Sequence, residues 1–316
     1  MGEARKAKLM PGDQKVLDPL TEWKSKKQKM ASQRPTDEFS GGRVRLGRFA
    51  LLTICGFLIF ALTMTFVPVL PAWVNYTARA GLLVIFASLW WAARGEHRLS
   101  RFRPVFFAYF AAVLGPSLGF FFGDWGLRLF GLTTHTPAGI AVAKFSQAFL
   151  IVIGVLAIAR LCGENLASLY IRKGRLVLGL SLGLIGAAAC SVLTLQQPAI
   201  RALGAAKLVS LLPWILLFVV SNALMEELVF RGLFLGRYEP LFGKWLAILS
   251  TALVFTLAHV QVSYTTPVGF LVVLFGLAIA WGWLMHKTGS LWGSALFHAG
   301  ADLLIILPIF SSLGAA

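Results

Sequence analysis

Apolar blocks of about 20 residues recur along this 316-residue chain and restrict its fold more than any other feature. A helix needs about 20 such residues to cross roughly 30 Å of hydrocarbon. Charged residues make up only 13% of the chain and hydrophobic residues 58%. A soluble domain carries about a quarter of its residues as charges, so this chain has too little polar surface for a water-soluble globule. The sequence therefore predicts an all-α protein, a polytopic transmembrane bundle of about eight or nine spans.

Nine segments after the polar N-terminal region are long and apolar enough to be counted as spans. The second is short and fits a tilted or re-entrant element, so eight spans remain an alternative. Residues 1–48 are polar and rich in Lys and Arg, which predicts a flexible cytoplasmic tail. The predicted spans are residues 49–73, 79–93, 104–123, 139–159, 176–195, 211–231, 245–263, 267–285 and 289–310.

The net charge of +16 is distributed in a way that indicates membrane topology. Twelve of the 29 Lys and Arg residues lie in the first 48 positions, and most of the others flank apolar blocks. This placement argues against nucleic-acid binding and for contact with lipid headgroups. The number of basic residues alternates between high and low along the non-spanning segments, with Arg79 counted in one of the poor segments. The positive-inside rule then predicts a cytoplasmic N-terminus and an outside C-terminus, in the plasma membrane if the owner is bacterial.

Five ionisable residues lie inside the last four predicted spans. An ionised group at mid-membrane costs on the order of 2.5–3.5 kcal/mol, and such groups normally face a bundle interior or a wet cavity and mark function. The C-terminal spans are therefore expected to hold the functional site. The five residues are Glu226, Glu227, His259, His298 and Asp302.

Helical spacing separates the two neighbouring glutamates. Glu227 and Arg231 lie four residues apart and can form a structural ion pair on one face of a helix. Glu226 points about 100° away from Glu227, because a helix has 3.6 residues per turn, and it shares its side with Asn222. The ion pair does not account for Glu226, which remains free for chemistry.

The two histidines have neighbours one helical turn away. Phe255 precedes His259 by one turn and can wall one side of the imidazole, although a single histidine on an apolar helix is more often a satisfied core residue. Asp302 follows His298 by one turn and can accept an imidazole N–H, which would fix the tautomer. A purely structural pair is an equally good interpretation of these last two residues taken alone.

Two histidines and a free carboxylate on three neighbouring helices suit the activation of water. A buried carboxylate can take a proton from water, and a nearby imidazole can share that task. A second histidine can stabilise the oxyanion of a tetrahedral intermediate. The spans contain no Gly-x-Ser-x-Gly elbow and no His-Glu-x-x-His zinc helix, and no cysteine lies near a histidine in sequence. Nucleophilic catalysis therefore has no candidate.

Taken together, these motifs resemble the CPBP family, the CAAX-protease and bacteriocin-processing membrane proteins that include the Rce1-type prenyl-protein endopeptidases. The family pattern is Glu-Glu-x-x-x-Arg on one helix, Phe-x-x-x-His on the next and His-x-x-x-Asn or Asp on a later one. Residues 226–231, 255–259 and 298–302 match it in this order. The resemblance covers roughly residues 207–310, the expected catalytic core. Residues 49–206 are expected to form N-terminal transmembrane helices, and residues 311–316 a short tail.

The resemblance implies an intramembrane endopeptidase whose site lies in a cavity open to the cytoplasmic side. It implies that Glu226 is the general base acting on water and that His259 assists it. His298 and Asp302 would form the pair that stabilises the oxyanion. Asp302 stands where the family often has Asn, and a carboxylate donates a hydrogen bond only when it is protonated, so an alternative role for Asp302 is to orient His298.

The resemblance also implies that Glu227 and Arg231 hold the site together, with Asn222 and Phe255 as further structural support. No cofactor is expected, and the alternative is a zinc ion held by Glu226, His259 and His298.

The expected partner is a membrane protein or peptide substrate, lipidated or not, in the lipid bilayer. Two other classes of function remain open, a non-catalytic binding or immunity protein and an ion-coupled transporter.

Overall fold

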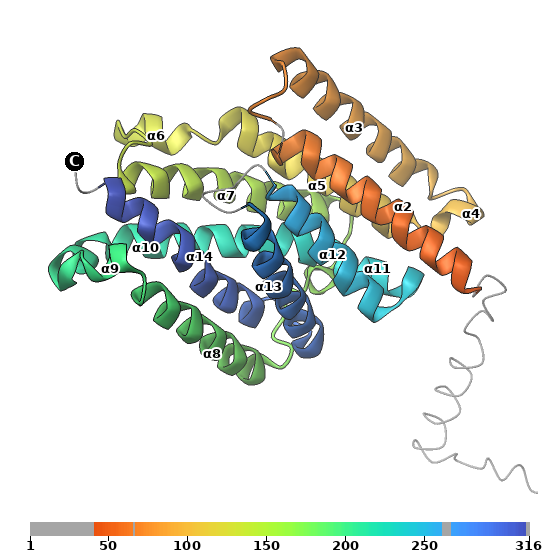
Figure 1. Cartoon of the computed structure of the whole chain (residues 1–316). Helices are drawn as coiled ribbons and strands as arrows, with labels where there is room; N and C mark the ends of the chain where they lie inside the picture. Colours follow the sequence, from red (N-terminus) through yellow and green to blue (C-terminus); the bar gives the residue numbers. More distant parts are fainter. Residues whose placement is uncertain (1–40, 66, 261–266, 314–316) are drawn as a thin grey trace, which may run out of the picture. The chain divides into compact units, whose positions relative to one another are not determined.

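The structure is a computed structural model that describes residues 41–65, 67–260 and 267–313. Residues 1–44 and residues 45–316 are separate units, and the fold described below is that of the second. Every regular element in the described ranges is a helix (Figure 1). Eight of these helices are long and apolar enough to cross a membrane. The prediction of an all-helical, multi-pass integral membrane protein is thereby confirmed.

The helices follow one another with short connections, and a few are broken by turns of tighter or wider helix. Their bounds are α2 Gly42–Phe60, η1 Ala61–Thr65, α3 Ala72–Ala92, α4 His97–Ser100, α5 Arg103–Phe122, α6 Trp125–Phe130, α7 Pro137–Leu161, η2 Leu166–Leu169, α8 Leu176–Leu195, α9 Pro198–Arg201, α10 Gly204–Glu226, η3 Glu227–Gly232, α11 Leu235–Phe242, α12 Lys244–Ala258, α13 Pro267–Thr288 and α14 Trp292–Leu313.

The first two spans have other bounds than the sequence suggested. Helix α2 begins at Gly42, before the expected start at residue 49, while the rest of the expected tail, residues 1–40, lies outside the described residues. Helix α3 begins directly after Pro71 and has 21 residues, so it is long enough to span. Proline fixes its own backbone angle and is tolerated just before a helix, which explains why the break falls there.

Arg79 lies inside α3, which corrects its assignment to a loop. Its side chain is 1% exposed, and its guanidinium donates to the Thr63 carbonyl at 2.7 Å and to the Ser117 hydroxyl at 3.2 Å. The ring of Phe120 lies 4.2 Å from the guanidinium carbon. A buried cation needs such partners, so Arg79 ties α3 to its neighbours and is no topology signal.

Among the predicted spans, the short one is α12 and not the second span, which is α3. It has 15 residues, so it is about 22 Å long at 1.5 Å per residue and falls short of the roughly 30 Å of a bilayer core. The nine spans counted in the sequence are therefore eight long helices and this shorter one. His259 follows directly at its C-terminal end.

The glutamate motif lies within a long helical segment that changes its winding. Residues Gly204–Phe242 form 39 residues of nearly continuous helix, with a π-helical turn, η3, between α10 and α11. The expected span ended at residue 231. Because the helix continues to Phe242, Glu226 lies well inside the bundle and reaches the depth of His259. Turns of π-helix are frequent at functional sites.

Helices α8 and α14 pack against each other through small residues. A Cβ atom added to Gly293 would lie 2.3 Å from the carbonyl oxygen of Gly179, and one added to Gly300 would lie 2.3 Å from the Cα of Ala187. Glycines allow this close backbone approach, which is typical of membrane helices. The contact fixes the position of α14, which carries His298 and Asp302.

Hydrogen bonds between loops show which helix termini share one end of the bundle. Arg172 donates to the Gly289 carbonyl at 2.6 Å, and Arg237 forms a 2.8 Å ion pair with Glu164. Arg45 donates to the carbonyl of Phe242. The Lys and Arg residues of these loops and helix termini, which we call the basic end, are Arg45, Arg94, Arg98, Arg101, Arg103, Arg160, Arg172, Lys173, Arg175, Arg237, Lys244 and Lys287.

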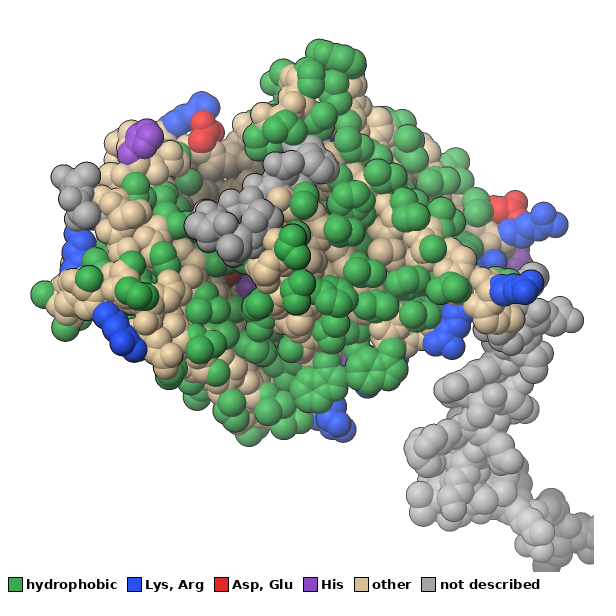
Figure 2. Space-filling view, in the orientation of Figure 1, with side chains coloured by type: hydrophobic (Ala, Val, Ile, Leu, Met, Phe, Trp, Pro, Cys, Tyr) green, Lys and Arg blue, Asp and Glu red, His purple; other side chains and the backbone are tan. Residues whose placement is uncertain are grey.

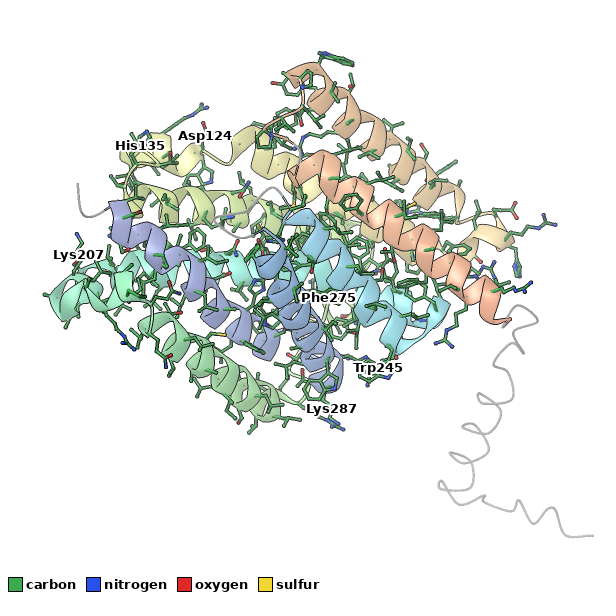
Figure 3. The ribbon with its side chains drawn as sticks, in the orientation of Figure 1. Asp124, His135, Lys207, Trp245, Phe275 and Lys287 are labelled. Atoms are coloured by element: carbon green, nitrogen blue, oxygen red, sulfur yellow. The ribbon has the colours of Figure 1, made fainter. Side chains whose placement is uncertain are left out.

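The opposite end is poor in charge. It contains α6, α9, the first turns of α7 and α10 and the last turns of α14. Helices α7, α9, α10 and α14 share a small apolar cluster that includes Ala141, Ile200 and Phe310. Its Lys and Arg residues at the surface are Arg128, Arg201 and Lys207. Figure 3 shows Lys207 at this end and Lys287 at the other. Hydrophobic side chains cover the surface between the two ends, as a bilayer-facing surface requires (Figure 2).

Candidate active site

Glu226 and Glu227 lie at the junction of α10 and η3 and have opposite surroundings. Both are buried, with 7% and 0% of their surface exposed. Glu226 closes α10 and faces a cavity, whereas Glu227 begins the π-helical turn and points into packed protein. The sequence predicted this divergence from the helical rotation between neighbouring residues.

Glu227 is saturated by partners. One carboxylate oxygen, Oε1, lies 2.7 Å from Nη1 of Arg231 and 2.8 Å from Nδ1 of His298. The other oxygen accepts a hydrogen bond from the hydroxyl of Ser294. The predicted Glu227–Arg231 ion pair is present and completely buried. A buried carboxylate with three donors is a fixed structural element rather than a reactive group.

The Arg231 guanidinium is enclosed by aromatic rings. Its central carbon lies 4.5 Å from the ring centroid of Phe255 and 5.2 Å from that of Trp281. Such rings stabilise a desolvated cation through their quadrupoles. Phe255 thus contacts both the Arg231 guanidinium and the rings of His259 and His298.

His298 is held rigidly on three sides. Its ring stacks on Trp281 with centroids 4.0 Å apart and planes 9° apart, and Phe255 meets it edge-on at 5.6 Å. Nδ1 donates to Glu227 at 2.8 Å. Nε2 therefore faces the cavity, 3.5 Å from Oε2 of Glu226 and 3.6 Å from Oδ1 of Asp302.

His259 is oriented by its own helix. Nδ1 lies 2.8 Å from the carbonyl oxygen of Phe255, one turn earlier, and the two rings are 4.4 Å apart. A carbonyl can only accept, so Nδ1 carries the proton. Nε2 points to Glu226, 3.9 Å from Oε2.

Asp302 lies beside this pair but is held by Asn222, whose amide donates to Oδ2 at 3.1 Å. The short imidazole contact expected for Asp302 is made by Glu227 instead, because the π-helical turn brings that carboxylate to Nδ1 of His298. Oδ1 of Asp302 lies farther from the imidazole, 3.6 Å from Nε2 of His298.

The result is a convergence of hydrogen-bond acceptors. With Nδ1 protonated in both imidazoles, each neutral histidine presents a lone pair at Nε2 to the Glu226 carboxylate. Distances of 3.5 and 3.9 Å exceed ordinary hydrogen bonds. An additional proton, or a water molecule that donates to two of these atoms, satisfies the arrangement. The site is therefore built to hold water or a mobile proton next to Glu226.

A cavity of about 310 Å³ adjoins these groups. Glu226, His259 and His298 line it, and most of its remaining wall is apolar. The additional lining residues are Lys144, Phe218, Asn222, Phe255, Phe270, Val273, Leu274, Leu277, Trp281, Ala301, Asp302, Leu304 and Ile305. An apolar cavity with a few convergent polar groups is the usual form of a ligand site.

Three residues of the site were not predicted from the sequence. Lys144 interrupts an apolar block and lines the cavity, so its charge was a usable signal. Trp281 and Ser294 contact His298 and Glu227, but tryptophan and serine in an apolar helix carry no signal of their own. Their roles follow only from the packing of α13 and α14 against η3.

In the described ranges, no group of three His, Cys, Asp or Glu side chains is arranged to hold a metal ion. The Nε2 atoms of His259 and His298 and the Glu226 carboxylate are chemically suitable zinc ligands. As they stand, Glu226 lies 3.9 and 3.5 Å from these two nitrogens, and Asp302 adds a further charge at the same point.

The fold and the site define a multi-pass helical membrane protein with a buried Glu/His cluster in an intramembrane cavity. Residues 208–304 match the family model described as type II CAAX prenyl endopeptidase Rce1-like. This segment, from α10 to α14, is thus an Rce1-like domain, and the resemblance read from the three motifs is confirmed. Neither a curated protein nor a solved structure matches the chain.

Proposed function

We propose that the protein is an intramembrane endopeptidase that hydrolyses a peptide bond of a membrane-associated substrate with water activated by Glu226. The observation that carries this proposal is the position of Glu226, a buried carboxylate in a cavity with the Nε2 atoms of His259 and His298 at 3.9 and 3.5 Å. The match to a CAAX endopeptidase family supports the same reaction class.

The reaction begins with water bound between Glu226 and His259. Glu226 accepts a proton from this water while the water oxygen forms a bond to the carbonyl carbon of the scissile peptide. The carbonyl oxygen becomes an oxyanion in a tetrahedral intermediate. Glu226 then passes the proton to the leaving nitrogen, the C–N bond breaks, and an acid and an amine are released.

His298 is the proposed oxyanion-stabilising group. Its Nδ1 is occupied by Glu227, so Nε2 donates to an oxyanion only when the ring carries a second proton. Glu227 and Asp302, at 2.8 and 3.6 Å, favour that imidazolium by their charge. Asp302 therefore supports His298 electrostatically, and Asn222 holds Asp302 in place.

Glu227 and Arg231 are proposed to position His298 rather than to react. Their pair is inaccessible to water or substrate, with both side chains 0% exposed. The same contacts that neutralise Glu227 also fix the imidazole against Trp281. The π-helical turn thus separates a structural glutamate from a reactive one in consecutive positions.

The test compares protein termini in membranes that contain the native protein, Glu226→Gln or Glu239→Gln. Glu239 lies in α11, where its side chain is 40% exposed, so it controls for the substitution itself. New termini are expected with the native protein and with Glu239→Gln, and none with Glu226→Gln. If all three membranes give the same termini while the proteins are folded, the endopeptidase proposal fails, and the binding and transport alternatives take its place.

A further inference from the structure

We propose that Trp90, Arg94 and Arg103 form a binding site for the phosphate of an anionic phospholipid in the leaflet at the basic end. These residues lie outside the Rce1-like domain of residues 208–304, and none of them lines the catalytic cavity. The inference therefore does not depend on the proposed function.

The indole ring of Trp90 holds two guanidinium groups close together. Trp90 lies in the last turn of α3, Arg94 follows the end of that helix, and Arg103 is the first residue of α5. The central guanidinium carbon of Arg94 lies 4.3 Å from a ring centroid of Trp90, and that of Arg103 lies 5.5 Å away. The face of an indole attracts cations, so one ring positions two charged side chains from different segments.

The protein supplies no counter-charge to this pair. In the part of the chain that the structure describes, no ion pair and no side-chain hydrogen bond involves Arg94 or Arg103, and Nε of Arg103 is buried without a partner. The acidic residues of the adjoining loops have other partners. Glu164 forms its ion pair with Arg237 at 2.8 Å, and Glu96 accepts a hydrogen bond from the first turn of α4. Two like charges on one ring repel each other, and a shared anion removes that cost.

The two charges act on the same point at the end of α7. Cys162 follows the last residue of that helix. Burial raises the pKa of its thiol, Glu164 adds to this effect, and the charges of Arg94 and Arg103 oppose it. The end of α3, the beginning of α5 and the end of α7 therefore surround the two guanidinium groups.

The site lies where the apolar surface of the bundle meets the basic end. Trp91, next to Trp90, is 68% exposed, and Leu161, the last residue of α7, is 82% exposed. Both residues lie at the ends of helices that are long enough to span a membrane. Tryptophan is enriched at the level of lipid headgroups, and exposed apolar side chains at this level contact acyl chains. A phospholipid can thus contact the apolar residues and the two guanidinium groups together.

The chemistry of the pair selects a phosphate with no neighbouring cation. A guanidinium binds phosphate through parallel N–H···O bonds, and contact of its face with a ring leaves the N–H groups at its edge free to donate. The amine of a zwitterionic headgroup would add a third positive charge to the site. An anionic headgroup, such as that of phosphatidylglycerol, adds none and is therefore preferred.

Native mass spectrometry of the purified full-length protein tests the site by counting bound lipids. The protein is kept in a neutral detergent with equal amounts of phosphatidylglycerol and phosphatidylcholine. The main variant combines Arg94→Gln with Arg103→Gln. Arg94→Gln alone is the second variant, because Arg103 is half-buried and its replacement can impair folding. The matched control combines Arg98→Gln with Arg160→Gln, which removes the same charge from two exposed positions at the basic end.

We expect the native protein and the control to retain phosphatidylglycerol in preference to phosphatidylcholine. The double variant should lose about tenfold in apparent affinity for phosphatidylglycerol, and Arg94→Gln alone should lose less. Equal retention of the two lipids by the native protein would overturn the assignment, as would equal retention of phosphatidylglycerol by the folded double variant and the control. If the double variant does not fold, unchanged binding by Arg94→Gln alone would overturn it.

A competition experiment separates a lipid headgroup from a free phosphate. Glycerol phosphate carries the same charged group but no acyl chains, and it is added at the concentration of phosphatidylglycerol. We expect phosphatidylglycerol to stay bound to the native protein, because its acyl chains contact the apolar surface beside the site. Displacement by an equal concentration of glycerol phosphate would show that the site binds a free phosphate and would refute the lipid as its occupant.

Discussion

Two glutamates that are adjacent in the chain have different tasks because of their partners. Glu227 is surrounded by Arg231, His298 and Ser294, whereas Glu226 lines the cavity, with the Nε2 atoms of His259 and His298 at 3.9 and 3.5 Å. Sequence spacing predicted the Glu227–Arg231 pair and the separate direction of Glu226. It could not predict that Glu227 also holds His298, since those two residues are 71 positions apart.

Replacing Glu227 by glutamine is expected to lower the free energy of unfolding by about 3–5 kcal/mol, because a desolvated Arg231 loses its counter-charge. Replacing Glu226 by glutamine removes no ion pair of this kind and is expected to cost less than about 1 kcal/mol. Reversible unfolding of both variants in detergent measures the difference. Equal destabilisation of the two would contradict the division of roles.

Removal of metal ions is expected to leave activity unchanged, since the proposed reaction uses Glu226 to activate water. The native protein is dialysed against a strong chelator, and cleavage is measured before and after together with the zinc content. Loss of activity that returns on addition of zinc would instead favour the alternative in which Glu226, His259 and His298 bind the metal.

At the scale of helices, the site depends on three elements whose details the sequence only partly predicts. The apolar blocks located the helices, but not the π-helical turn η3 or the short α12. In η3, Glu227 contacts His298 and Ser294 of α14, and no local pattern records contacts between residues so far apart in the chain. The boundary between α2 and α3 was misplaced because both flanks of Pro71 are equally apolar.

The close contact of α8 and α14 gives a prediction for one glycine. Gly293→Ala places a methyl group against the backbone of Gly179 and is expected to destabilise the protein by about 1–3 kcal/mol. Because α14 carries His298, activity should fall as well. Gly276→Ala in α13 meets nothing within 4 Å and serves as the control. Unfolding midpoints and cleavage rates measure both effects, and equal behaviour of the two variants would argue against a tight α8–α14 contact.

At the scale of the whole molecule, the catalytic cavity lies among helices whose loops are rich in Lys and Arg at one end of the bundle and poor in them at the other. The sequence predicted the class of fold, the three motif helices and the residues that converge on them. Arg79 and Lys144 show the limit of counting charges along the chain. Arg79 is a buried structural cation, and Lys144 lines a cavity. Only the packing of several helices distinguishes these two residues from charged residues in loops.

The central claim is that Glu226 activates water for peptide-bond hydrolysis. The most direct measurement uses the purified protein in lipid vesicles, a peptide spanning a bond that is cut in native membranes, and water enriched in ¹⁸O. The native protein should release a product whose new carboxyl group carries one ¹⁸O atom, and Glu226→Gln should slow its formation at least about 100-fold. Unchanged cleavage by Glu226→Gln, or a new carboxyl group without ¹⁸O, would contradict this mechanism.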